Sequence, residues 1–166
     1  MKDFDFASEM VIGKKHMKKL EYNVNDYKFV EILKKLFTKL NITELNEAHT
    51  KANNEYELFT TLGKDSNTEF HNIFYNELHD GWKEMKNEYE KFIKEVVLPF
   101  LELDEALVQT FPSFRVHLPN NVAIVINHYD SDENHKHPTG EINFIYAFTE
   151  MFDTNTVYVE KMPLLD

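Results

Sequence analysis

The spacing of apolar residues along the chain changes near residue 110. Before this point, apolar side chains recur mainly at helical intervals of three and four positions, and after it they alternate with polar ones or form short β-branched blocks. The pattern therefore predicts one domain over 1–166, with mainly helical support over 1–109 and a β-sheet region over 110–166.

The first clear helix is expected over about 27–40, with Asp26 as its N-cap. Its apolar stripe consists of Phe29, Val30, Leu33, Leu36, Phe37 and Leu40. A second, short helix is expected around 43–52, in a more polar stretch of the chain. We interpret the stripe of the first helix as core, because a surface helix turns its apolar side towards the rest of the domain.

The strongest helical pattern begins at a capping box formed by Ser66 and Glu69. Its apolar positions step by four and three through Leu78, Trp82, Met85, Tyr89, Phe92 and Val96. This register passes Gly81 unbroken, which favours one long helix that bends there and ends or kinks within a turn of Pro99. Such a stripe suits the face of a sheet, or a partner protein that Trp82 and its aromatic neighbours would anchor.

Four strands are expected after residue 110, at 114–118, 122–129, 142–149 and 156–160. Turn-forming residues separate them, and no helical pattern lies between them. Short strands spaced in this way favour an antiparallel sheet over a parallel one with helical crossovers.

Composition narrows the class of protein. Hydrophobic residues make up 42% of the chain, which is typical of a globular protein, and the net charge of −11 argues against nucleic-acid partners. The sequence contains no cysteine, which excludes thiolate catalysis and cysteine-ligated metals. No apolar run reaches the ~18–20 residues of a membrane span, and the first residues do not resemble a signal peptide. We therefore expect a soluble, cytoplasmic protein without membrane or nucleic-acid partners.

The residues that suggest chemistry gather between 128 and 137, where three histidines and three acidic residues lie within ten positions. His128 and Asp130 share the parity of the apolar residues in 122–126, so on a strand their side chains would point to the same side. A histidine and a carboxylate at a strand end are two of the three ligands of a mononuclear Fe(II) site. A histidine hydrogen-bonded to an acid of a nearby loop explains the same pair without a metal.

A wider resemblance favours the metal site. The blocks Phe-Arg-Val-His-Leu-Pro at 114–119, Val-Ala-Ile-Val-Ile-Asn-His-Tyr-Asp at 122–130, His-Pro-Thr-Gly-Glu-Ile-Asn-Phe at 137–144 and Thr-Val-Tyr-Val-Glu at 156–160 resemble the StrG-type family of streptomycin-biosynthesis proteins. That family is similar to the Fe(II)/2-oxoglutarate-dependent oxygenases. The resemblance covers about residues 110–166 and implies an α+β fold, with the N-terminal helices packed on an antiparallel, incomplete double-stranded β-helix of the jelly-roll or cupin type.

The resemblance also implies roles for individual residues. His128 and Asp130 fall on the metal ligands, and Arg115, His137, Glu141 and Asn143 are expected to line the pocket for the substrate or for 2-oxoglutarate. Arg115 is the only arginine of the chain, which suits contact with a carboxylate. The implied activity is oxidation, such as hydroxylation, of a small organic substrate in specialised-metabolite biosynthesis, with Fe(II) as cofactor and 2-oxoglutarate as co-substrate.

The sequence also departs from this family pattern. No histidine follows His137, and no arginine follows Arg115, so the distal metal ligand and the residue that anchors 2-oxoglutarate are both absent from the expected places. Either the chain is a fragment or a naturally shortened copy, which we favour, or His137 or another group completes the site. Two alternatives to a complete enzyme remain open, a non-catalytic metal- or ligand-binding protein on a cupin-like scaffold and an interaction protein. Association between copies of the chain is also left open.

Overall fold

A computed structural model describes residues 18–51, 68–118, 130–138 and 140–157 of the chain. Contacts between Cα atoms divide the chain into two compact units. The first, called the helical unit here, comprises Tyr22–His128 and Tyr146–Glu150, and the second unit comprises Met1–Glu21, Tyr129–Ile145 and Met151–Asp166. The expectation of one domain over 1–166 stays a prediction.

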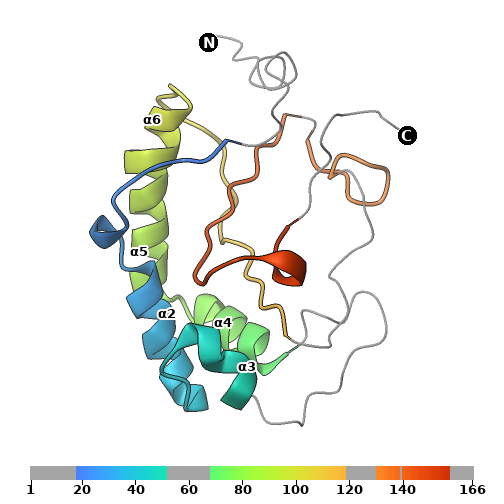
Figure 1. Cartoon of the computed structure of the whole chain (residues 1–166). Helices are drawn as coiled ribbons and strands as arrows, with labels where there is room; N and C mark the ends of the chain where they lie inside the picture. Colours follow the sequence, from blue (N-terminus) through green and yellow to red (C-terminus); the bar gives the residue numbers. More distant parts are fainter. Residues whose placement is uncertain (1–17, 52–67, 119–129, 139, 158–166) are drawn as a thin grey trace. The chain divides into compact units, whose positions relative to one another are not determined.

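The described part of the helical unit is built from helices and helical turns (Figure 1). Its α-helices are α2 (Phe29–Phe37), α3 (Ala48–Lys51), α4 (Glu69–His79), α5 (Lys83–Phe92) and α6 (Leu98–Phe100). Its shorter turns are η1 (Val24–Asp26), η2 (Thr38–Leu40), η3 (Leu45–Glu47) and η4 (Ile93–Val97), of which η4 is π-helical. The second unit contains the turn η5 (Asp153–Asn155). No helix in the described ranges is long and apolar enough to cross a membrane.

Helix α2 confirms the expected helix over about 27–40, because η2 continues it to Leu40. Its buried residues are Phe29, Ile32, Leu33, Leu36 and Phe37, so the stripe lies slightly to one side of the predicted one. The N-cap is Lys28 rather than Asp26, which lies in η1 and accepts a hydrogen bond from the Asn23 side chain. The turn η3 and helix α3 confirm the short helix expected around 43–52.

The expectation of one long helix after residue 66 is wrong, because the helical conformation is interrupted between α4 and α5. Gly81 has a φ of +84°, a left-handed conformation that an α-helix does not contain and that glycine adopts without steric cost. Trp82 then caps α5, and the helical stretch ends at Phe100, close to Pro99 as expected. Helix α2 packs against both α4 and α5 in the helical unit.

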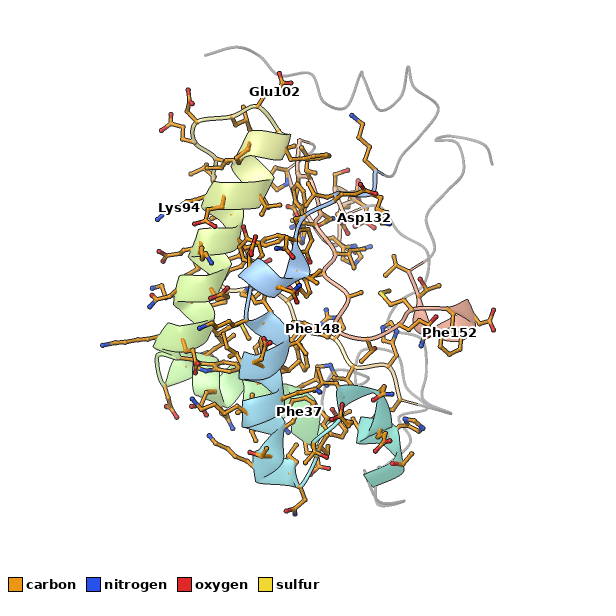
Figure 2. The ribbon with its side chains drawn as sticks, turned by 60° about the vertical axis from the view of Figure 1, so that its left-hand side comes forward. Phe37, Lys94, Glu102, Asp132, Phe148 and Phe152 are labelled. Atoms are coloured by element: carbon orange, nitrogen blue, oxygen red, sulfur yellow. The ribbon has the colours of Figure 1, made fainter. Side chains whose placement is uncertain are left out.

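The π-helical turn η4 changes which sequence positions are buried after it. A π turn contains an extra residue compared with an α turn. Met85 and Phe92 are buried as the heptad-like pattern predicts, but the next buried position is Val97 rather than the predicted Val96. Lys94, in the same turn, is exposed and points away from the unit (Figure 2). Residues beyond η4 therefore follow a frame that is displaced by one position.

The core of the helical unit is aromatic. Phe70 and Phe74 of α4 are 0% and 2% exposed, and Phe114 stacks on Phe74 with ring centroids 4.2 Å apart and an interplanar angle of 10°. Phe92 lies at the centre of a second group, where its ring meets those of Phe29 and Tyr146 edge-on. Since Phe92 belongs to this core, it is not available as an anchor for a partner protein.

The predicted strand at 114–118 is not formed. The backbone N–H of Phe114 donates to the Tyr75 hydroxyl at 2.9 Å, and that of Val116 donates to His71 Nε2 at 3.3 Å. Both acceptors are side chains of α4, so these backbone groups bind a helix rather than a neighbouring strand. Phe114 and Leu118 are buried, which explains why the sequence pattern looked like a strand.

The described residues contain no β-strand at all, so the predicted jelly roll or double-stranded β-helix is wrong for this part of the chain. At 142–149 the alternating aromatic residues Tyr146 and Phe148 lie in the helical unit, where Phe148 approaches Phe114 and Tyr146 approaches Phe29. Alternation therefore reflects an extended segment that packs on helices, without a partner strand. The strand expected at 122–129 and the end of the one at 156–160 lie outside the described residues.

Candidate functional site

The residues that the sequence nominates lie in different places. Asp130, His137, Glu141 and Asn143 all belong to the second unit, in a segment of 130–138 and 140–143 that we call the polar loop. Arg115 belongs to the helical unit, where its Nη1 donates to the carbonyl of Phe114 at 3.2 Å. His128 lies outside the described residues. The structure thus groups four of the six nominated residues.

Asp130 and Asn143 hold the two ends of the polar loop together. Asn143 Nδ2 donates to Asp130 Oδ2 at 2.6 Å, and the backbone N–H of His137 donates to the Asp130 carbonyl at 2.9 Å. A hydrogen bond to an ionised carboxylate is stronger than one between neutral groups. Side chain and backbone of Asp130 are therefore both tied to later residues of the loop.

His137 and Glu141 form the second pair in the polar loop. The distances from His137 Nδ1 to the two carboxylate oxygens of Glu141 are 2.8 and 3.0 Å. The turn between them is closed by the N–H of Glu141, which donates to the carbonyl of Pro138 at 3.0 Å. With Nδ1–H donating to Glu141, the lone pair of a neutral ring lies on Nε2, which makes His137 an oriented hydrogen-bond acceptor.

Asp132 organises the tip of the polar loop, and the sequence alone gave it no role. Its Oδ1 accepts the backbone N–H groups of Asn134 and His135 and also binds His135 Nδ1, each at 2.8 Å. These hydrogen bonds, with the backbone N–H of His135 contributing most, lower the pKa of the Asp132 carboxyl. The signal was readable, because aspartate often accepts backbone N–H groups two and three residues ahead in a turn. Figure 2 labels Asp132 at this tip.

The polar loop does not fit an Fe(II) site. Across the described residues, no group of three or more His, Cys, Asp or Glu side chains could hold a metal ion. A mononuclear iron site of this kind needs three such ligands on one face, whereas the polar loop pairs its acids with Asn143, His137 and His135. The expectation of metal binding is therefore wrong for the described residues, which support no chemical step through iron. The assignment of His128 and Asp130 as a ligand pair stays a prediction, because His128 lies outside the described residues.

Comparisons with known proteins give one relative. The chain is 24% identical over 146 residues to the streptomycin biosynthesis protein StrG of Streptomyces griseus. The match covers 88% of this chain and 65% of StrG, so the chain spans about two thirds of the length of that relative. The similarity reaches well beyond the last third of the chain, to which the sequence motifs were confined. It supports a StrG-like family, and the relation to Fe(II)/2-oxoglutarate-dependent oxygenases stays a prediction.

No family model matches the chain, and no solved structure matches it. The similarity to StrG therefore defines the class of protein only at the level of a distant family.

Proposed function

We propose that the chain binds a polar small organic molecule through the polar loop and acts in the biosynthesis of a small-molecule metabolite. The observation that carries the proposal is the pair of Asp130 and Asn143, which presents a carboxylate and a carboxamide side by side on a closed loop. In a binding site, a small number of polar groups at fixed positions orients the ligand. The similarity to StrG, whose name places it in streptomycin biosynthesis, supports the biosynthetic role.

The charge of the polar loop indicates which small molecules it prefers. Asp130, Asp132, Glu133 and Glu141 carry negative charge, and Lys136 is the one lysine among them. The chain as a whole carries a net charge of −11. Such a surface attracts cations and repels anions, so the preferred ligand carries amino and hydroxyl groups rather than carboxylate or phosphate groups.

Binding is tested by calorimetry with a panel of amino alcohols, neutral polyols and hydroxy acids of matched size. We expect heat of binding for the amino alcohols, weaker binding for the polyols and none for the hydroxy acids. The variant Asp130→Ala should lose this binding, whereas Glu105→Ala, which removes an exposed carboxylate from the helical unit, should keep it. Equal binding of all three ligand classes, or binding that survives Asp130→Ala, contradicts the proposal.

Oxidation of a small organic substrate with Fe(II) and 2-oxoglutarate is the reaction implied by the sequence resemblance, and it stays a prediction. It is tested by following the formation of succinate from 2-oxoglutarate in the presence of Fe(II) and oxygen, with His128→Ala as the control. Succinate formation that depends on His128 would make the chain an oxygenase. Absence of succinate formation would contradict this prediction.

A further inference from the structure

His71 is a buried ionisable side chain in the helical unit that the proposed function does not use. Among the described residues, Thr68 and His71 are the buried polar side chains, and His71 is 1% exposed. It lies on α4 between Phe70 and Phe74, with the ring of Phe114 5.9 Å away. A histidine in such apolar surroundings is stable only if its ring nitrogens have hydrogen-bond partners.

Both ring nitrogens of His71 have partners. Nδ1 is 2.7 Å from the Thr68 hydroxyl oxygen, and Nε2 accepts the backbone N–H of Val116 at 3.3 Å. A nitrogen that accepts a hydrogen bond must keep its lone pair, so the proton of the neutral ring lies on Nδ1, which donates to Thr68. The contact with Val116 therefore exists only while the ring is neutral.

Val116 belongs to the segment 114–118, which we call the strap. The backbone of the strap also binds Tyr75, whose hydroxyl accepts from the Phe114 N–H at 2.9 Å and donates to the Phe114 carbonyl at 3.4 Å. Tyr75 and His71 lie one helical turn apart on α4 and hold the strap at two successive points.

We propose that His71 is a proton-operated latch for the strap. Protonation of Nε2 turns this acceptor into a donor, so two N–H groups then face each other and the contact with Val116 is lost. The same step places a positive charge among aromatic rings, which burial disfavours. Both effects drive the strap away from His71 when the ring is protonated. The inference does not depend on the ligand proposed for the polar loop.

Charged and ionisable residues lie near the latch on both the strap and α4. On the strap, Arg115 carries a permanent positive charge and donates to the Phe114 carbonyl, and His117 is exposed. On α4 the neighbouring ionisable residues are Glu69, which is exposed, and Tyr75, and α2 contributes the apolar ring of Phe37 to the contact with Phe114.

The latch is tested by hydrogen exchange measured by NMR while the pH is lowered from about pH 7.5, with the ring signals of His71 reporting its protonation. We expect the protection factor of the Val116 amide to fall about ten-fold, the equivalent of one lost hydrogen bond, along the titration curve of the His71 ring. The amide of Phe74 on the same helix should keep its protection. Unchanged protection of Val116 while His71 titrates would overturn the proposal.

Two variants separate the latch from general acid effects. His71→Gln provides a non-titrating acceptor near the position of Nε2, so Val116 should stay protected at all these pH values. His79→Gln removes an exposed histidine from the last turn of α4 and should leave the pH dependence intact. If His71→Gln does not fold, the wild-type titration alone decides. A His71 ring that titrates only when the α4 amides also lose protection counts against the latch.

Discussion

The carboxamide of Asn143 donates a hydrogen bond of 2.6 Å to the carboxylate of Asp130, which lies thirteen residues earlier in the chain. These two residues were nominated for different roles, Asp130 as a metal ligand and Asn143 as a pocket residue. Their direct pairing makes them one structural feature that closes the polar loop. The side chain of Asn143 therefore helps to hold the carboxylate of Asp130.

Replacement of Asn143 by alanine should loosen the polar loop and weaken ligand binding. A hydrogen bond to a charged group contributes roughly 1.5–3 kcal/mol, so we expect the affinity for an amino-alcohol ligand to fall by about ten-fold or more. The His137 amide, which donates to the Asp130 carbonyl, should exchange faster. Calorimetry and hydrogen exchange measure the two effects.

Asn134→Ala is the matched control for this prediction. Asn134 lies in the same loop, but its contact with Asp132 is made by the backbone N–H, which alanine retains. Its exchange pattern and ligand affinity should equal those of the wild type. Equal effects of the two substitutions would show that the pairing with Asp130 is not what closes the loop.

Replacement of Phe74 by alanine should strongly destabilise the helical unit. Phe74 is 2% exposed and stacks on Phe114, so the substitution removes a ring from a packed core and separates the strap from α4. Such changes cost about 3–5 kcal/mol in the free energy of unfolding, as measured by urea denaturation. Leu107→Ala, at a fully exposed position, should change it by less than about 0.5 kcal/mol. Similar losses for both variants would contradict the assignment of the core.

The pKa of Asp132 should rise towards its usual value of 3.8 in the variant His135→Ala. The substitution removes the side-chain donor and keeps the backbone N–H, so part of the lowering remains. Because the folded pKa is lowered, the bonds of Asp132 stabilise the loop above the unfolded pKa and are lost as the pH falls through the folded value. An NMR titration of the carboxyl carbon measures this change, and an unaltered pKa would rule out the contact with His135.

Tyr146 should make the helical unit sensitive to alkaline pH. Burial, followed by the nearby Tyr22 hydroxyl, raises the pKa of Tyr146 well above its ordinary value of 10.0. A raised folded pKa means that the stabilisation is fully present below the unfolded pKa and is lost as the pH rises through the folded one. Urea midpoints should therefore fall at high pH more in the wild type than in Tyr146→Phe. Parallel curves for the two proteins would exclude this role.

The helices were predictable because their signals are local. The spacing of Phe29, Leu33 and Phe37 is sufficient to place α2, whatever the rest of the chain does. The break at Gly81 was not predictable from periodicity, since the apolar register continues across it. Alternation after residue 110 gave the wrong fold class, because an extended segment packed on helices buries every second side chain just as a strand does.

The candidate site was only partly predictable, because a list of residues does not determine which side chains pair. Polar composition nominated Asp130, His137, Glu141 and Asn143, and the structure places all four in one loop. These side chains are brought together by turns at Asp132 and Pro138. The predicted strands did not include those turns. His71 escaped notice for a related reason, because its partner Val116 is 45 positions away.

The π-helical turn Ile93–Val97 has a consequence for aligning this chain with other proteins. When an additional residue is accommodated as a π turn, the helix keeps its axis. The sequence positions that face inward are shifted by one residue after the turn. The heptad-like spacing that places the buried residues up to Phe92 therefore does not continue to Val97, which begins a register shifted by one residue. A relative that lacks the additional residue would need a one-residue gap here, and an ungapped comparison would pair its buried side chains with exposed ones of this chain.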